Sequence, residues 1–286
     1  MGATRSEGRP RAAKRPGGEV GDALAELGLE PSSARGQSFL RDPRVAARQA
    51  MAASIAPGER VLEVGGGLGV LTAELAKRGA KVRVIEIEPR LAALLAAKGL
   101  DGVEVEEGDA LVAELGTPDK VVANIPYSIS SELIERLVET GASKIVIMLQ
   151  AEVADRLAGA PGVKAWARLP AIVRRRYDVE VVERVPPNAF FPQPKVKSCV
   201  VRLTRRKSAG GPPDAAYAAV VGALFAARRK KVRNSVGRAA GAVGAHAEGA
   251  QAAAEAAGVA DLRPEEMTVK QFEELTAALL RLRMTK

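Results

Sequence analysis

The chain has 286 residues, of which 47% are hydrophobic, and a net charge of +9. That length can bury one substantial core and a smaller second unit, and no apolar stretch is long enough to span a bilayer, so we expect no membrane contact. One cysteine, Cys199, rules out an internal disulfide framework, and with one histidine, His246, the chain lacks a zinc-type ligand cluster. We therefore expect a cytoplasmic protein with no bound metal, in which Cys199 is a buried structural thiol.

The excess positive charge lies at the two ends of the chain. Residues 1–18 sum to +4 and residues 204–286 to +6, whereas residues 19–203 sum to −1. A single basic run is often no more than a solvated face, but two runs that flank a near-neutral block favour a polyanionic partner. Prolines, glycines and the lack of apolar periodicity predict that residues 1–20 form a disordered basic arm.

From residue 58 the sequence alternates between short apolar runs and helical patterns. Strands are expected at 60–64, 81–87, 103–106, 120–123 and 144–149, and helices at 70–77, 89–98 and 131–139. Short strands separated by helices predict an α/β fold with a Rossmann-like, doubly wound parallel sheet. Two more β segments, 171–185 and 196–203, are expected to close the sheet as an antiparallel hairpin.

Beyond a Gly- and Pro-rich linker at 208–213 the pattern becomes helical. Apolar side chains recur at helical spacing over residues 217–236, and much of the basic run at 228–233 lies on the opposite face. The sequence thus predicts a large α/β unit at 21–204 and a smaller helical unit at 205–286 that presents positive charge outward.

A glycine-rich loop, Glu63-Val-Gly-Gly-Gly-Leu-Gly69, follows the first expected strand, where the backbone can approach a nucleotide closely. A dinucleotide fingerprint would require glycine at position 70 or 72, which hold valine and threonine. The Glu-x-Gly-x-Gly-x-Gly spacing instead matches the loop of S-adenosylmethionine-dependent methyltransferases. Glu86, at the end of the next strand, is placed to hold ribose hydroxyls. Asp109, after the third strand, can accept from an adenine amine. The alternative for Glu86 is an ordinary exposed acid at a strand end, and the alternative for Asp109 is a turn residue.

The tetrapeptide Asn124-Ile-Pro-Tyr127 follows the strand at 120–123 and carries the most specific chemistry. An exocyclic base amine is a poor nucleophile because its lone pair is delocalised into the ring. The Asn124 oxygen and a neighbouring main-chain carbonyl can accept from its N–H groups, which localises the lone pair without an ionised group. Pro126 would hold the loop, and Tyr127 would offer a flat face to the base. A plain Asn-x-Pro turn is the alternative.

Seven motifs occur in an order that resembles one known family. They lie at residues 36–42, 63–72, 84–86, 108–110, 124–130, 185–196 and 228–235. With these motifs, residues 35–238 resemble the KsgA-type ribosomal RNA adenine dimethyltransferases. The resemblance implies an enzyme that uses S-adenosylmethionine to dimethylate two adjacent adenines near the 3′ end of small-subunit ribosomal RNA. The substrate would be a pre-assembled subunit, and we expect the protein to act as a monomer.

The resemblance also implies roles for individual residues. The cofactor would be held by Gln37, Ser38, Leu40, Gly65, Gly67, Glu86, Ile87, Asp109, Ala110 and Asn124. The target adenine would be held by Asn124, Ile125, Pro126, Tyr127 and Phe190. In that site Asn124 and the Ile125 carbonyl would hold the amine, and Tyr127 and Phe190 would stack on the two faces of the ring. A hydrophobic anchor of the turn is the alternative role for Phe190. A basic helix would bind RNA through Arg228, Arg229, Lys230, Lys231 and Arg233.

Two positions depart from the family pattern. Ser38 stands where asparagine is usual, which predicts a shorter or water-mediated contact to the cofactor. Gly66 stands where proline is common, which predicts a looser loop.

Three alternatives stay open at this level. A related methylase could act on large-subunit RNA, although the long basic C-terminal region argues against it. A ribosome-assembly factor could keep the fold without catalysis, although the intact Asn124-Ile-Pro-Tyr127 loop argues against that. A DNA-bound transcription factor derived from the family is the third.

Overall fold

The computed structural model describes residues 18–31, 37–163, 166–207 and 210–284. Within them a central sheet contains β2 (Arg60–Val64), β3 (Lys81–Glu86), β4 (Val103–Glu107), β5 (Lys120–Asn124), β6 (Lys144–Gln150), β7 (Tyr177–Val185) and β9 (Ser198–Arg205). Its order is β4-β3-β2-β5-β6-β9-β7. Strands β2 to β6 are parallel to one another, and β9 runs antiparallel to both β6 and β7. The predicted doubly wound sheet, closed by an antiparallel pair, is thus confirmed.

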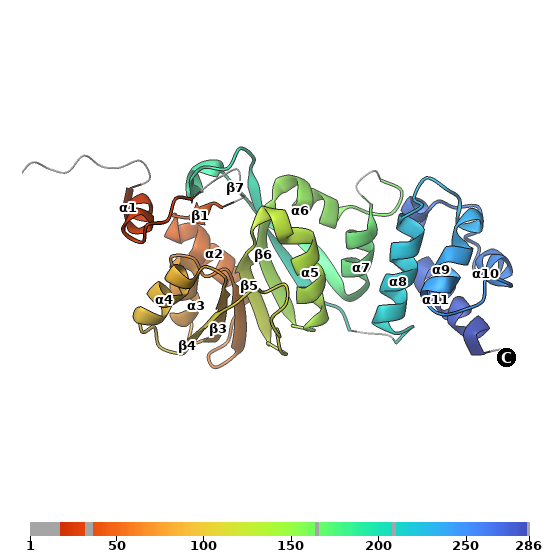
Figure 1. The fold of residues 1–286 in the computed structure, drawn as a ribbon, viewed down its shortest axis with the longest axis horizontal. Coiled ribbons are helices and arrows are strands. Elements are labelled where there is room, and N and C mark those ends of the chain that lie inside the picture. Colours follow the sequence, from red (N-terminus) through yellow and green to blue (C-terminus); the bar gives the residue numbers. More distant parts are fainter. Residues whose placement is uncertain (1–17, 32–36, 164–165, 208–209, 285–286) are drawn as a thin grey trace, which may run out of the picture.

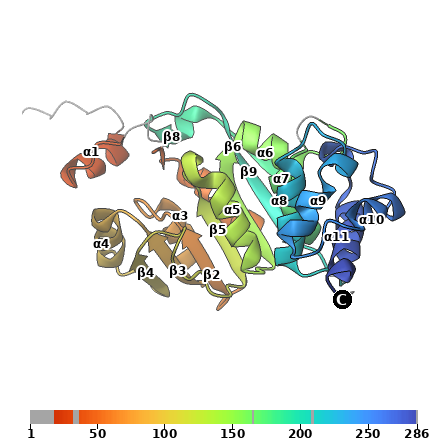
Figure 2. The same ribbon diagram turned by 45° about the vertical axis from the view of Figure 1, so that its right-hand side comes forward.

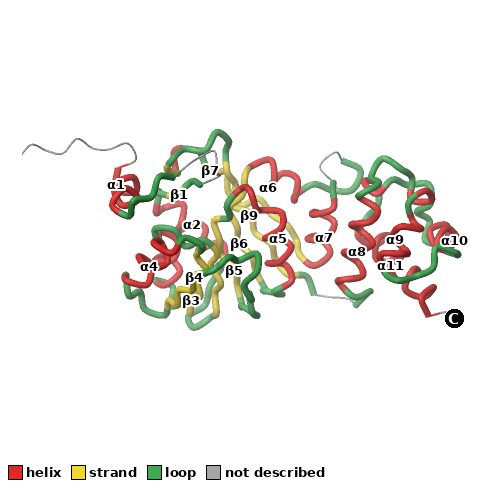
Figure 3. Tube along the Cα trace, in the orientation of Figure 1, coloured by secondary structure: helices red, strands yellow, loops and turns green. Residues whose placement is uncertain are grey.

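Successive side chains on each strand enter two different cores, as the period of two along a strand requires. On β6, Ile145 and Ile147 enter one core, whereas Val146 and Met148 enter the other. The first core is covered by α5 (Ser130–Glu139), α6 (Ala151–Ala158) and α7 (Arg168–Arg176), and the second by α2 (Pro43–Ala53), α3 (Val70–Ala76) and α4 (Pro89–Ala97). Figure 3 shows the strands in the middle with helices on both sides. The inner parallel strands β2, β3, β5 and β6 are therefore buried on both faces, as expected for parallel strands, whereas the edge strands β4 and β7 are partly exposed.

Three elements that the sequence patterns did not predict precede the sheet. Helix α1 (Gly18–Glu26) begins inside the range expected as a disordered arm, and the rest of that arm, residues 1–17, lies outside the described residues. Strand β1 (Phe39–Leu40) pairs antiparallel with β8 (Phe190–Phe191) in a separate ribbon. Helix α2 follows Asp42, whose carboxylate accepts from the Arg44 amide at 2.9 Å. An aspartate cap before a first-turn proline is a recognisable start signal.

The expectation of a strand over residues 171–185 is wrong for residues 171–176. Residues 168–176 form α7, and the strand begins only at Tyr177. Leu169 and Val173 of this helix pack in the core of the sheet and Ala171 packs in the core of the C-terminal helices, so α7 is buried on two sides. Three arginines in its last turn complement the negative end of the helix dipole. Strand β9 likewise begins at Ser198 rather than at 196. The β7–β9 connection contains β8 and a 3₁₀ turn, η3 (Pro187–Ala189).

The C-terminal unit consists of α8 (Asp214–Phe225), η4 (Val232–Asn234), α9 (Val236–Ala242), α10 (Ala250–Ala256), η5 (Pro264–Glu266) and α11 (Val269–Met284). It lies at the opposite end of the long axis from α1 (Figure 1). The single helix expected over 217–236 is interrupted: the basic run at 228–233 lies between α8 and α9, and only its last two residues belong to the 3₁₀ turn η4. Backbone pairing ends the helix, because the amides of Val232 and Arg233 donate to the carbonyls of Leu262 and Ala260 at 2.8 and 3.0 Å.

The two units share a packed junction, and α8 lies beside α7 in Figures 1 and 2. The Arg175 side chain of α7, 3% exposed, forms ion pairs with Asp214 and Glu273. Its guanidinium lies 4.3 Å from the centre of the Tyr217 ring. Trp166, which precedes α7, packs in the same core as the C-terminal helices. The division expected at residues 204 and 205 stays a prediction, as does the linker at 208–213, of which residues 208 and 209 lie outside the described chain.

Across the described ranges, no helix is both long and apolar enough to cross a membrane. Among the same residues, no three histidine, cysteine, aspartate or glutamate side chains gather as a metal-ion site. Cys199 is fully buried in β9, in agreement with its expected structural role.

Candidate active site

A cavity of about 490 Å³ opens at the carboxyl ends of β2, β3 and β5. Strands β2 and β5 are neighbours in the sheet, but the chain continues from them in opposite directions, to β3 and to β6. Doubly wound sheets bind ligands at such a switch point, and the volume suits a small-molecule ligand. The topology therefore places the site here before any side chain is considered.

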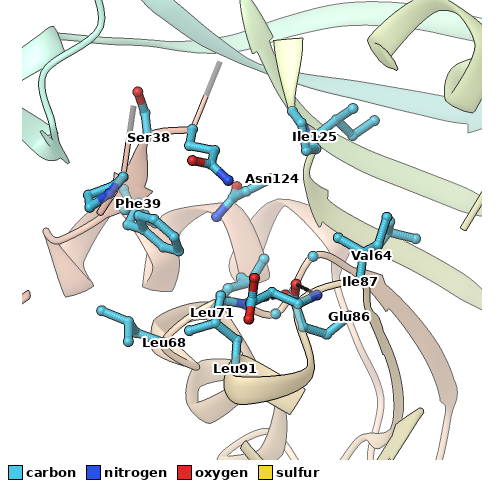
Figure 4. Close-up of a pocket in the computed structure, with 18 of the residues that line it drawn as sticks. Ser38, Phe39, Val64, Leu68, Leu71, Glu86, Ile87, Leu91, Asn124 and Ile125 are labelled. Atoms are coloured by element: carbon cyan, nitrogen blue, oxygen red, sulfur yellow. Dashed lines mark hydrogen bonds between the residues drawn. The ribbon is translucent and has the colours of Figure 1, made fainter. Parts of the chain in front are cut away.

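The residues predicted for the cofactor and for the target base all line this one cavity. They are Gln37, Ser38, Leu40, Gly65, Gly67, Glu86, Ile87, Asp109, Ala110, Asn124, Ile125, Pro126, Tyr127 and Phe190. Figure 4 shows Ser38 and Phe39 approaching from one side, Asn124 and Ile125 from the end of β5, and Glu86 and Ile87 from the end of β3. Segments that are far apart in the sequence thus meet around one space.

The glycine loop holds Glu86 in place at the wall of the cavity. Gly65 and Gly67 have φ of 74° and 54°, a region that favours glycine. The Gly67 amide donates to one Glu86 carboxylate oxygen at 2.8 Å, and the Glu88 amide donates to the other at 3.0 Å. Because Glu86 is only 4% exposed, its orientation is fixed before any ligand binds.

Close packing surrounds Gly66, whereas the replacement of the usual proline by glycine predicts a looser loop. A Cβ atom at this position would lie 2.7 Å from Leu95 Cδ1 and 2.7 Å from Val84 Cγ1. Both neighbours are buried apolar side chains. They occupy the volume that a larger residue would need, so packing restrains the loop here.

Behind the loop lies Glu63, a buried carboxyl group to which the sequence analysis assigned no role. It is 1% exposed, and neither of its oxygens has a hydrogen-bond partner in the described part of the chain. Burial, and to a smaller extent the nearby Glu86 carboxylate, raise its pKa to about 8. The nearby Thr72 hydroxyl lowers this pKa by more than the Glu86 carboxylate raises it, and burial outweighs both. Glu63 is therefore mostly neutral at pH 7.

Asn124 ends β5 with a buried acceptor that the protein does not use. Its Oδ1 atom has no hydrogen-bond partner among the described residues, although buried polar atoms are nearly always paired. The strand end is held firmly, since Gln49, fully buried in α2, donates to the Ala123 carbonyl at 3.0 Å. Figure 4 shows the Asn124 side chain extending into the cavity. An unsatisfied acceptor at a ligand cavity is the feature expected of a group that binds a donor on the substrate.

Two aromatic rings line the same cavity. Tyr127 begins a 3₁₀ turn, η2 (Tyr127–Ile129), and its hydroxyl lies 2.6 Å from the buried hydroxyl of Ser198 at the start of β9. Burial raises the pKa of Tyr127 above its ordinary value. Phe190 is 3% exposed and packs in the core beneath α2. Both rings are held by rigid elements, so their orientation is set in advance.

One wall of the cavity is not predicted by any pattern in the sequence. Residues 28–31, which follow α1, also line it. Arg90, in the first turn of α4, donates to the carbonyls of Leu27 and Gly28 at 3.2 and 3.1 Å. No local pattern marks these residues, because their position depends on a contact more than sixty residues away in the chain.

The five basic residues predicted to bind RNA lie in the C-terminal unit, and three of them have acidic partners. Arg228 pairs with Glu265 at 2.7 Å, and Lys231 with Asp261 at 2.9 Å. Arg233 also pairs with Asp261. Arg229 and Lys230 are exposed and form no ion pair within the described ranges. These two carry the charge that is available to a polyanion.

The strand order and the glycine loop, which lacks the dinucleotide fingerprint, define the class of protein. A doubly wound sheet, closed by the antiparallel β7–β9 pair, carries a glycine loop after β2, Glu86 at the end of β3 and the unused acceptor of Asn124 at the end of β5. These features place the protein among the Rossmann-like methyltransferases that use S-adenosylmethionine.

Comparison with known proteins defines the family. The model of the ribosomal RNA adenine dimethylase family matches residues 32–276, which extends beyond residue 238 into α11. Ribosomal RNA small subunit methyltransferase A of Deinococcus radiodurans is 39% identical over 263 residues, covering 90% of this chain and 88% of that one. The chain therefore belongs to the ribosomal RNA adenine dimethylase family.

Solved structures agree with this assignment. A dimethyladenosine transferase from Plasmodium falciparum has a TM-score of 0.74 at 26% identity, covering 85% of this chain and 98% of that chain. The 23S rRNA methyltransferase ErmE has a TM-score of 0.60 at 33% identity, covering 84% of this chain and 99% of that chain. The fold match is thus stronger for the dimethyladenosine transferase, although the sequence identity is higher for ErmE.

Proposed function

We infer that the protein dimethylates the exocyclic amines of two adjacent adenines near the 3′ end of small-subunit ribosomal RNA, with S-adenosylmethionine as the methyl donor. The family, and the small-subunit methyltransferase of Deinococcus radiodurans, support this substrate. The observation in this structure that carries the inference is the buried, unpartnered Oδ1 atom of Asn124 at the cavity. A base amine supplies the N–H donors that this acceptor lacks.

The residues around the cavity fit the cofactor. S-adenosylmethionine supplies an activated methyl group on a positively charged sulfur. Glu86 presents a fixed carboxylate suited to ribose hydroxyls, and Asp109 presents a carboxylate beside the Gly108 backbone for the adenine amine. Ile87, 65% exposed, offers an apolar surface to the adenine ring. The main-chain amides of the glycine loop lie close enough to contact the ligand directly.

The same cavity can hold the target base. The adenine is extruded from its RNA strand to enter the cavity, and Tyr127 and Phe190 stack on its two faces, a contact worth about 1–3 kcal/mol per base. Asn124 Oδ1 and the Ile125 carbonyl accept from the amine and localise its lone pair for in-line attack on the methyl carbon. The lost proton passes to solvent or backbone oxygen, because no side chain here is a strong base.

A methyl-transfer assay tests this function. Unmethylated small subunits are incubated with labelled cofactor, and the modified nucleotide is mapped. We expect label on two adjacent adenines of small-subunit RNA, and Asn124→Ala to reduce turnover at least about a hundredfold while cofactor binding is kept. Unchanged turnover in the variant would refute the role of Asn124. Label on large-subunit RNA would favour the ErmE-like alternative, and no label would favour an assembly factor without catalysis.

We further propose that the substrate is a pre-assembled subunit, recognised by a monomer in the cytoplasm. The exposed pair Arg229 and Lys230 lies between α8 and α9, in a unit at the far end of the molecule from the residues 28–31 that wall the cavity. A short RNA in the cavity does not extend to both sites, whereas a folded subunit does. Methylation of assembled subunits that greatly exceeds methylation of naked RNA is the expected result.

A further inference from the structure

A second hollow, of about 480 Å³, adjoins the β1–β8 ribbon. Its lining includes Arg41, Arg44, Arg48, Asn188 and Ala189. Leu40 pairs with Phe190 across the ribbon, and both line the methyl-transfer cavity. The next residue along, Arg41, donates its amide to the Ala189 carbonyl at 2.9 Å, and both of these line the second hollow. The two spaces are therefore separated only by the width of this ribbon.

The three arginines of the hollow differ in how they are paired. Arg44 contacts Asp42 at 3.0 Å, and Arg48 contacts Glu183 at 2.7 Å, each through Nε and Nη2. The remaining amino group of each guanidinium makes no hydrogen bond with the described residues. Arg41 is exposed, and its side chain has neither an ion pair nor a hydrogen bond in the described part of the chain. The hollow thus presents one unneutralised guanidinium and two more that are held in fixed orientations with donors to spare.

We propose that this hollow binds the sugar-phosphate backbone of the RNA beside the target adenine, with Arg41 as the anchoring contact. The inference rests on the proposed function, since it assigns backbone contacts to the same RNA. An extruded base enters the cavity while its phosphates stay outside, and the hollow adjoins the cavity across the β1–β8 ribbon, with the Asp42 carboxylate in its lining already bound by Arg44. Guanidinium groups bind phosphate through parallel N–H donors. Such contacts fix the register of the strand, so that the correct adenine reaches Asn124.

Arg41→Gln tests the proposal in methyl transfer to unmethylated small subunits. We expect the KM for subunits to rise about tenfold, the loss expected for one charge-assisted contact, while kcat and the KM for S-adenosylmethionine stay unchanged. The slope of log affinity against log salt should become shallower by about 0.7–0.9, the value for one phosphate. Arg41→Lys keeps the charge and should restore most of the slope.

Lys81→Gln is the matched control, because Lys81 is exposed and lies at the amino end of β3, whereas the cavity lies at the carboxyl ends of the strands. It removes one charge as well and should behave as the unmodified protein does. If Arg41→Gln and Lys81→Gln give the same KM and salt slope, the hollow does not bind phosphate. Failure of Arg41→Lys to restore the slope would also overturn the proposal, since packing rather than charge would then be responsible.

Filter retention of labelled, unmethylated subunits separates this inference from the proposed function. Retention does not require methyl transfer. If the unmodified protein transfers no methyl group but loses retention on Arg41→Gln, the proposed function fails and the backbone contact stands. If methyl transfer occurs and retention is unaffected by Arg41→Gln, the contact fails and the function stands.

Discussion

Replacing the buried Glu63 by glutamine should make the folded protein less sensitive to alkaline pH. Glu63 ionises near 4.5 when exposed to water, but burial raises its pKa to about 8 in the folded chain. Between these two values folding takes up a proton, so the free energy of unfolding falls as pH rises from about 4.5 to about 8. The shift corresponds to roughly 5 kcal/mol as an upper limit, at about 1.4 kcal/mol per pKa unit.

Glu63→Gln keeps the size of the side chain and removes the titration. The difference in unfolding free energy between the variant and the unmodified protein should therefore grow in favour of the variant from pH 5 to pH 8.5, by several kcal/mol in order of magnitude. Urea denaturation followed by circular dichroism at a series of pH values measures this difference, and other titrations cancel in it. Glu104→Gln is the matched control, because Glu104 is exposed on β4. A difference that stays constant with pH would show that Glu63 is ionised in the folded protein, and the reasoning would fail.

Three further predictions concern the site and the C-terminal unit. Ser198→Ala removes the hydroxyl 2.6 Å from the Tyr127 hydroxyl; we expect kcat to fall about three- to tenfold, the effect of one lost hydrogen bond, with cofactor affinity unchanged in calorimetry. If Ser198→Ala weakened cofactor binding by the same factor as it lowers kcat, the substitution would have disturbed the whole site rather than the Tyr127 contact. Gly66→Ala should lower the free energy of unfolding by about 1–3 kcal/mol through overpacking, measured in urea, and an unchanged midpoint would contradict the packing described. Neutralising Arg229 and Lys230 together should weaken subunit retention and reduce its salt slope by about 1.5; a smaller effect than that of neutralising their ion-paired neighbours would contradict this assignment.

Local patterns in the sequence predicted most of the sheet and the residues of the cavity. Strands β2, β3, β5 and β6 are visible as short apolar runs because each is buried on both faces, whereas the edge strand β4 alternates valine with glutamate. The glycine loop and the Asn124-Ile-Pro-Tyr127 motif lie at strand ends, where the topology of a doubly wound sheet brings them together. Their convergence follows from the order of the elements, which a sequence displays directly.

Two errors show where local patterns are insufficient. Residues 171–176 contain the same apolar and β-branched residues as a strand, but their buried face is satisfied by α5 and α8, so a helix forms. Residues 226–231 are rich in alanine, arginine and lysine, which favour helix. Backbone pairing of Val232 and Arg233 with the segment at 260–262 ends the helix instead. In both places, tertiary contacts outweigh propensities of less than about 1 kcal/mol per residue.

The sequence by itself determined the class of fold, the cofactor loop and the acceptor that marks the chemistry, because each depends on residues close together in the chain. Only the tertiary structure decided which charges are available. It neutralises Arg228 and Lys231 with acids thirty or more positions away, and it gives Arg229 and Arg41 no ion pair within the ranges that the structure describes. It also buries Glu63 beside Glu86. The energy of a charge depends on its solvent exposure and its nearest partners, and the folded chain alone sets both.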